Sequence, residues 1–181
     1  MNNLKPINLD NGVIQIHPLR PSDLIQNDKL VNDLFEIFGD EKTLPFNEEK
    51  IIKDKVNISN HLLGVTYGYQ EQLRFTHFLT LKPINKTIGQ IIILSPKSIE
   101  SVYNIKNTWF IEFYLNKMLW NNGVMTDALA GIISNMQEQG ILKIGALVKR
   151  ENQPSIRVLE KTGFKKIRVF DLKQDYYEIS N

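Results

Sequence analysis

The stretch of the chain from 109 to 148 constrains the fold more than any other. An apolar run at 109–115 predicts a strand, which leads through a loop at 116–122 into an amphipathic segment that ends near Gln139. An alternating run at 142–148 predicts a second strand. A strand, a helix and a strand with short joins form a right-handed crossover, which makes the two strands parallel.

The rest of the chain adds antiparallel strands and further helices. Strands are predicted at 13–19, 72–81 and 88–94, with a terminal hairpin at 167–170 and 176–179. Helices are predicted to start at Pro21, to span 28–38, to run from Asn47 to Leu63 before Gly64, and to span 153–162. The polar stretch 96–107 predicts an exposed loop. The fold class is therefore mixed α/β (α+β), with a mostly antiparallel central sheet, one parallel crossover and helices on both faces.

Composition excludes several classes of function. A length of 181 residues, 42% hydrophobic and 23% charged, favours one domain over residues 1–181. A net charge of +2 without a basic stripe argues against nucleic-acid binding. The absence of cysteine excludes disulfides and a thiol nucleophile, and three scattered histidines give no metal-ligand spacing. No signal peptide or membrane-length run is seen, so we expect a cytoplasmic protein without a membrane partner.

Two helix starts are candidate binding features. Gly123 precedes the helix after the 116–122 loop, and its backbone can approach an anion that the free N–H groups of the helix then bind. A plain turn explains the same glycine, which fits neither the dinucleotide fingerprint nor the P-loop. Asn152 and Ser155 open the helix at 153–162, where helix capping also accounts for both, and Pro154 is tolerated in a first turn.

Glu112 is the candidate general base. It interrupts the apolar strand at 109–115 and shares a face with Phe110 and Tyr114, where a carboxylate either takes a proton from a substrate or is paired or solvated. His77 is a second possible base, although a lone histidine on an apolar strand face usually belongs to the core. A local positive cluster could attract a phosphorylated cofactor or be a solvated face: Lys161, Lys165, Lys166 and Arg168.

Two sequence strings resemble the GNAT acetyltransferase superfamily, most closely its RimJ/RimL-like branch. The first is Trp-Asn-Asn-Gly-Val-Met-Thr-Asp-Ala-Leu at 120–129, and the second is Asn-x-x-Ser-Ile-Arg-Val-Leu-Glu-Lys-x-Gly-Phe at 152–164. The chain departs from the superfamily at Trp120, where many members have Gln or Arg, and at Met125, where a small residue is usual. A methionine there either crowds the pyrophosphate or turns away. Leu159 stands where many members carry a tyrosine that acts as the general acid.

The resemblance implies a GNAT-like fold, acetyl-CoA as cosubstrate, and no metal. It assigns Glu112 as the base and Ser155 as the hydrogen-bond donor to the departing thiolate. It also assigns a set of residues to the cofactor: Phe113, Tyr114 and Leu115 by their main chain, the loop residues Asn121, Asn122, Gly123, Val124, Met125 and Thr126 at the pyrophosphate, and Asn152 at the pantetheine arm.

The implied reaction is direct acetyl transfer to a primary amine, which is a peptide N-terminus or a small molecule. The alternative is a non-catalytic acyl-CoA-binding or protein-interaction module, and the chain would be a monomer or a homodimer. The helices at 23–63 carry acidic side chains that would suit a cationic acceptor or simply face solvent: Asp28, Asp33, Glu36, Asp40, Glu41, Glu48 and Glu49.

Overall fold

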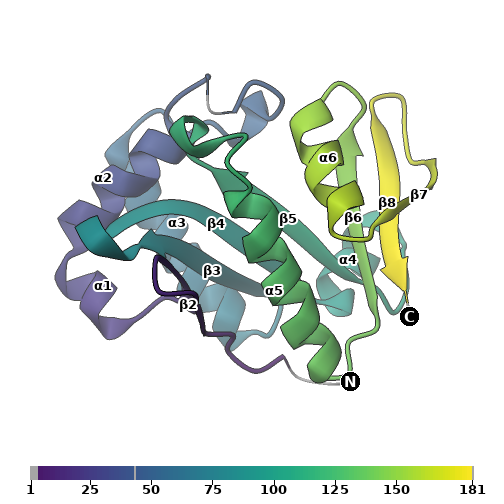
Figure 1. Cartoon of the computed structure of the whole chain (residues 1–181), viewed down its shortest axis with the longest axis horizontal. Helices are drawn as coiled ribbons and strands as arrows, with labels where there is room; N and C mark the ends of the chain where they lie inside the picture. The colour runs from purple at the N-terminus through teal and green to yellow at the C-terminus, as the bar shows by residue number, and fades with distance from the viewer. Residues whose placement is uncertain (1–3, 43, 181) are drawn as a thin grey trace.

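One sheet runs through the protein, in a computed structural model that describes residues 4–42 and 44–180 (Figure 1). Within this part of the chain the sheet has eight strands in the order β1-β2-β3-β4-β5-β6-β8-β7. The strands are β1 Leu9–Asp10, β2 Ile14–Pro18, β3 Arg74–Leu81, β4 Lys86–Leu94, β5 Trp109–Leu115, β6 Lys143–Lys149, β7 Lys165–Val169 and β8 Gln174–Ser180.

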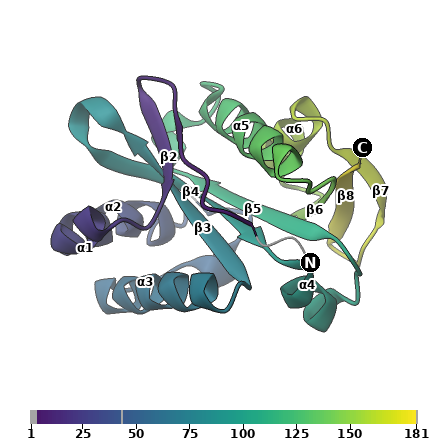
Figure 2. The ribbon, with the colours of Figure 1, turned by 90° about the horizontal axis from the view of Figure 1, so that it is seen from below.

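Helices cover both faces of the sheet. Figure 2 shows α1 to α4 on one side and α5 and α6 on the other. The α-helices are α1 Pro21–Ile25, α2 Asn27–Phe38, α3 Lys55–Gln70, α4 Pro96–Tyr103, α5 Val124–Glu138 and α6 Gln153–Lys161, and the 3₁₀ turns are η1 Glu48–Lys50, η2 Lys82–Ile84 and η3 Lys117–Leu119. Their apolar sides bury separate clusters, one around Leu129 and Ile91 beneath α5 and another around Leu34, Ile58 and Phe78 beneath α2 and α3.

The parallel pair is short. All other neighbouring strands are antiparallel within the described chain, whereas β5 pairs with β6 in parallel only at Trp109↔Ile144 and Phe110↔Gly145. Beyond Phe110 the two strands diverge, and the β5 edge that faces β6 has no strand partner. The predicted fold class and the predicted crossover are confirmed.

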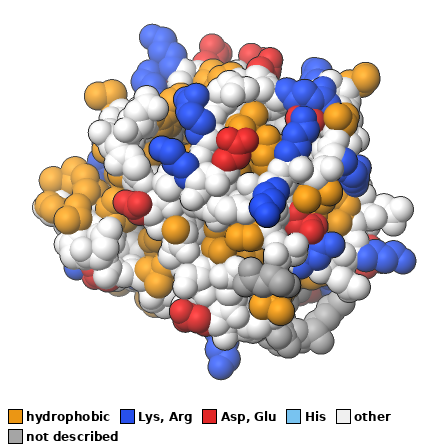
Figure 3. Space-filling view, turned by 45° about the vertical axis from the view of Figure 1, so that its right-hand side comes forward, with side chains coloured by type: hydrophobic (Ala, Val, Ile, Leu, Met, Phe, Trp, Pro, Cys, Tyr) orange, Lys and Arg blue, Asp and Glu red, His pale blue; other side chains and the backbone are white. Residues whose placement is uncertain are grey.

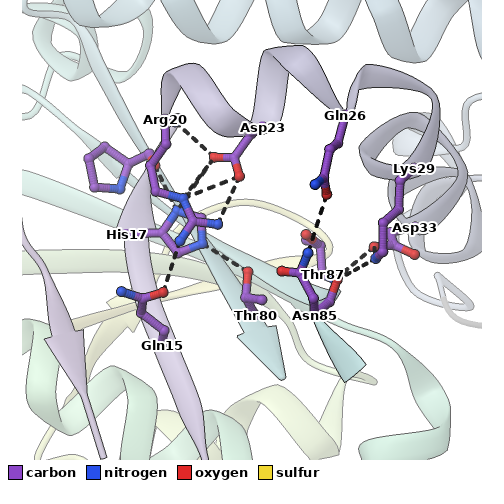
Figure 4. Close-up of polar contacts among 11 residues, drawn as sticks. Gln15, His17, Arg20, Asp23, Gln26, Lys29, Asp33, Thr80, Asn85 and Thr87 are labelled. Carbon is purple, nitrogen blue, oxygen red and sulfur yellow. Dashed lines mark hydrogen bonds and ion pairs between the residues drawn. The ribbon is translucent and has the colours of Figure 1, made fainter. Parts of the chain in front are cut away.

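A polar cluster ties α1 and α2 to the sheet (Figure 4). The buried His17 ring contacts Thr80 Oγ1 through Nε2 at 2.8 Å, and Asp23 at the start of α1 accepts from Arg20 at 2.8 Å. Further along, the Asp33 carboxylate of α2 accepts the backbone N–H of Thr87 at 2.9 Å. These contacts fix the helices that precede the 39–54 segment.

The prediction of a helix from Asn47 to Leu63 was wrong at both ends. Asn47 starts only the single turn η1, and the chain then extends through Ile52, whose N–H donates to Phe38 O at 2.7 Å. The cap of α3 is Asp54, which accepts from Asn57 N at 2.8 Å. Gly64 lies inside α3, because tertiary packing of its apolar side outweighs the weak helix propensity of glycine.

The stretch 96–107 is not a loop throughout, because Pro96–Tyr103 forms α4. Ser95 accepts the N–H of Ser98 and caps the helix, while Pro96 occupies the first turn, where it is tolerated. The helix is amphipathic, with Ile99 buried, so a mostly polar composition concealed a single apolar side. The terminal hairpin is confirmed as β7 and β8, which pair in antiparallel fashion.

His77 belongs to the core. It is fully buried, and its Nε2 accepts from the Ile7 N–H at 3.4 Å. Burial lowers the pKa of His77 from 6.5 to about 4, and burial followed by the charge of Arg74 does the same to His61. Both rings are therefore neutral in the folded protein near neutral pH.

We predict that the free energy of unfolding falls as the pH drops from 6.5 to 4. The unfolded chain binds protons at these histidines in that window and the folded chain does not, so each contributes a loss of about 3 kcal/mol at most. His77→Gln keeps an acceptor for Ile7 N. In urea titrations at a series of pH values, it should reduce the slope of the free energy of unfolding against pH by about one proton. Equal slopes for the wild type and the variant would contradict the assignment of His77.

Candidate active site

A cavity of about 220 Å³ opens where β5 and β6 diverge. It is lined from three directions, by β5, by the loop into α5 and by α6, and is covered by the 44–47 segment. The lining residues are Leu44, Pro45, Phe46, Asn47, Phe113, Tyr114, Leu115, Leu119, Trp120, Asn121, Gly123, Val124, Met125, Thr126, Asn152, Pro154, Ser155, Arg157, Val158 and Lys161.

The cavity runs along the open edge of β5. Consecutive residues of a strand point to opposite faces, yet Phe113, Tyr114 and Leu115 all line it, so it passes beside the strand from one face of the sheet to the other. The exposed edge carries backbone groups that an extended ligand could pair with. One is already used, because the Trp120 indole Nε1 donates to Leu115 O at 2.9 Å.

The loop before α5 has the geometry that an anion-binding turn requires. Asn121 and Gly123 have left-handed φ angles of 62° and 77°, which turn the chain sharply into the helix. The first turn of α5 has no side-chain cap, and the N–H groups of Val124, Met125 and Thr126 have no backbone acceptor within the described residues. Free N–H groups at the positive end of a helix dipole favour phosphate.

Met125 does not obstruct this turn. Its side chain is only 5% exposed and packs in the core beneath α5, so its backbone is what it presents to the binding turn. Asn122, in contrast to the other loop residues, does not line the cavity, and its side-chain amide donates to Trp120 O at 3.1 Å. Asn122 therefore lies outside the cavity lining, and a contact between its backbone and the cofactor stays a prediction.

The start of α6 faces the same cavity. Asn152 is buried and its Oδ1 accepts from Ser155 N at 3.2 Å, so it caps the helix. Its Nδ2 donates to none of the described residues and remains available to a ligand in the cavity. Ser155 lines the cavity, whereas Leu159 is buried in the core and faces away from it.

Two cations of α6 lie at the cavity, Arg157 and Lys161. Two other predicted members of the positive cluster have partners elsewhere: Lys166 pairs with Asp175 at 2.5 Å, and Arg168 stacks on Phe170 and Tyr176. Figure 3, which brings this side of the protein forward, shows basic side chains spread over the face with acidic ones between them. The positive charge relevant to a ligand is therefore local to α6.

Glu112 lies beside the cavity and not in its lining. Its side chain is 32% exposed on the α3 face of the sheet, where Oε2 accepts from the Tyr114 hydroxyl at 3.3 Å. Tyr114 does line the cavity, and burial followed by the Glu112 charge raises the pKa of its hydroxyl. The phenol thus stays protonated and connects the carboxylate to the cavity.

Nothing in the sequence indicated that residues 44–47 line the cavity. They form a short connection between α2 and η1, and no local pattern relates them to β5 or α6, which are remote in sequence. Ion pairs position this segment across the opening, from Asp40 to Lys117 at 3.0 Å and from Glu49 to Lys149 at 3.2 Å. A ligand in the cavity would lie under this cover.

The family model of the acetyltransferase (GNAT) domain matches residues 16–165. The chain belongs to the GNAT acetyltransferase family. It is therefore an acyltransferase whose acetyl donor is acetyl-CoA, as the sequence strings led us to expect. The described residues contain no group of three or more His, Cys, Asp or Glu that could hold a metal ion. None of their helices has the length and apolar character needed to cross a membrane.

Solved structures share the fold over nearly the whole GNAT chain, while no curated protein matches it at a significant level. An acetyltransferase from Bacillus anthracis aligns with a TM-score of 0.68 at 19% identity, covering 96% of this chain and 98% of its own. RimJ of Mycobacterium smegmatis, solved with CoA disulfide, aligns with a TM-score of 0.65 at 18% identity, covering 97% of this chain and 86% of its own. A ribosomal-protein alanine acetyltransferase from Vibrio fischeri aligns with a TM-score of 0.66 at 17% identity, covering 97% of this chain and 96% of its own.

We predict that Gly123→Val weakens acetyl-CoA binding by about tenfold or more in calorimetric titration, because a branched side chain strains the left-handed turn. Gly12→Val is the matched control, since Gly12 has a φ of 89°, has no neighbouring atom within 4 Å of where a Cβ would lie, and does not line the cavity. Equal affinities for the two variants would remove the turn from the binding site.

Asn152 variants separate capping from ligand binding. Asn152→Asp keeps the oxygen that accepts from Ser155 N but replaces the amide donor by a charge, so we expect unchanged stability and about tenfold weaker acetyl-CoA binding. Asn152→Ala should in addition lose about 1 kcal/mol of stability in thermal unfolding. If Asn152→Asp binds acetyl-CoA as well as the wild type, Asn152 serves only as a cap.

Proposed function

We propose that the protein transfers the acetyl group of acetyl-CoA directly to a primary amine, and that it belongs to the RimJ/RimL-like branch of the family. The observation that carries the proposal is the cavity at the β5–β6 divergence, with an anion-binding turn at one side and a carboxylate linked to it through Tyr114. A direct transfer needs no enzyme nucleophile, which suits a chain without cysteine.

The cofactor-binding roles follow from the placement of each group. The N–H groups of 123–126 would bind the pyrophosphate, with Arg157 and Lys161 adding positive charge. The free β5 edge at Phe113 would bind the pantetheine arm like an added strand. The Asn152 amide would donate to the same arm. Acetyl-CoA supplies the activated acyl group in this arrangement.

The chemical roles fall to Glu112 and Ser155. Glu112 would take the proton of the attacking amine, directly or through water, with Tyr114 orienting the carboxylate. A serine hydroxyl is too weak an acid to protonate a thiolate fully, so Ser155 would stabilise the departing sulfur by a hydrogen bond.

The acceptor is proposed to be the α-amine of a peptide or a small amine. The structural neighbours include a RimL described as a ribosomal-protein α-N-acetyltransferase, which supports a peptide acceptor. The acidic residues at 23–63 give no support for a polycation, because several are neutralised by lysines of the same chain. These pairs are Asp33–Lys29, Glu36–Lys86, Asp40–Lys117 and Glu49–Lys149.

We predict that Glu112→Gln lowers kcat by about a hundredfold in a thiol-release assay with acetyl-CoA and a panel of peptide and small amines. The affinity for acetyl-CoA should not change, because Glu112 lies outside the cavity lining. Glu100→Gln is the matched control, since this carboxylate of α4 pairs only loosely with Lys106, at 3.9 Å.

The alternative function gives a different result in the same assay. A non-catalytic acyl-CoA-binding module would bind acetyl-CoA in calorimetry, release no thiol with any amine of the panel, and be indifferent to Glu112→Gln. That combination would overturn the proposal.

A further inference from the structure

A lysine of the protein lies beside Glu112, the carboxylate proposed as the base. Lys50 Nζ is 4.0 Å from Glu112 Oε2. Within the described part of the chain, no other lysine or arginine is within ion-pair distance of this carboxylate. The pair joins the η1 turn to the α3 face of β5.

The backbone holds Lys50 close to the cavity. Its N–H donates to the carbonyl of Asn47 at 2.8 Å, and Asn47 lines the cavity. On either side of Lys50, Glu49 pairs with Lys149 of β6 at 3.2 Å and Ile52 N donates to Phe38 O at 2.7 Å. The turn is therefore anchored to β6 through Glu49, and its Lys50 side chain extends toward Glu112 of β5.

The Lys50–Glu112 contact leaves the ammonium free to move. The separation is at the limit of an ion pair, and the two side chains are 44% and 32% exposed, so solvent screens the attraction. Lysine also has a long, flexible stem that can redirect its amine at little cost. Lys149 differs, since its side chain is only 21% exposed and its Nζ is held by Glu49.

We infer that Lys50 is an internal acetyl acceptor, which the enzyme modifies in cis on Nζ. The inference rests on the proposed function and names an acceptor for the same site. Glu112 or a water beside it takes a proton from the Lys50 ammonium, and the neutral amine attacks the thioester carbonyl. The C–N bond forms, the C–S bond breaks, and the second proton that the nitrogen loses passes to the departing CoA thiolate. The first proton returns from Glu112 to solvent. The product, N-acetyllysine, carries no charge and cannot pair with Glu112.

The test is acetyl-CoA alone, with no added amine. The full-length protein is incubated and digested, and acetyl occupancy is measured by mass spectrometry at Lys50, Lys149 and Lys53. Lys53 is an exposed neighbour and reports the rate of uncatalysed acetylation. Lys149 reports the rate for a lysine whose amine is held in an ion pair. We expect occupancy at Lys50 to rise about tenfold faster than at either control, because Lys50 lies beside the proposed base and a transfer within one chain needs no bimolecular encounter.

Two variants and a dilution series make the result specific. Glu112→Gln should reduce the rate at Lys50 to that of Lys53, and Lys50→Arg should remove the modification while keeping the positive charge. A first-order rate that does not change on dilution of the protein assigns the transfer to one chain, whereas a rate proportional to protein concentration overturns the cis assignment.

The remaining outcomes separate this inference from the proposed function. Equal acetylation at all three lysines, or acetylation at Lys50 that survives Glu112→Gln, would overturn the inference as uncatalysed chemistry. An unmodified Lys50 in an enzyme that acetylates added amines would overturn the inference and leave the proposed function standing. Failure of acetyl transfer to every amine, internal or added, would overturn both.

Discussion

The site depends on the short parallel pairing between β5 and β6. Two residue pairs join the strands, and beyond Phe110 the β5 edge carries backbone groups with no strand to satisfy them. Buried backbone groups without partners are costly, so this edge needs water or a ligand along its length. The same divergence leaves room for the α5 turn and for the start of α6, whose free N–H groups and polar side chains converge on one cavity.

Much of this region could be predicted because its signals are local. Hydrophobic periodicity predicts the crossover from 109 to 148. The ends of α6 are indicated by residues typical of helix termini, which are Asn152, Pro154 and Gly163. Of the residues assigned to the cofactor, all but Asn122 line the cavity. Met125 could be placed only by the structure, since its flexible side chain is compatible with either direction at the sequence level.

The parts that could not be predicted are held by contacts between distant segments. Asn47 and Asp54 are both good N-caps, and burial of Ile51 and Ile52 against the α2–α3 cluster decides in favour of Asp54. The cover at 44–47 is placed by ion pairs that span roughly a hundred residues of sequence in one case, Lys149–Glu49. Period-two alternation placed Glu112 on a face with Phe110 and Tyr114, but only the structure shows Lys50 beside it.

Trp120 gives the enzyme an optical reporter of its own. The chain has two tryptophans, and they occupy different environments: Trp109 packs on Phe75 at 5.8 Å, whereas Trp120 lines the cavity and donates its indole N–H to Leu115 O. Indole emission responds to polarity and to the loss of a hydrogen bond, so a chain with phenylalanine at 109 would emit only from the cavity. Occupancy of the β5 edge would then be followed in real time as a change in fluorescence, without a label and without turnover.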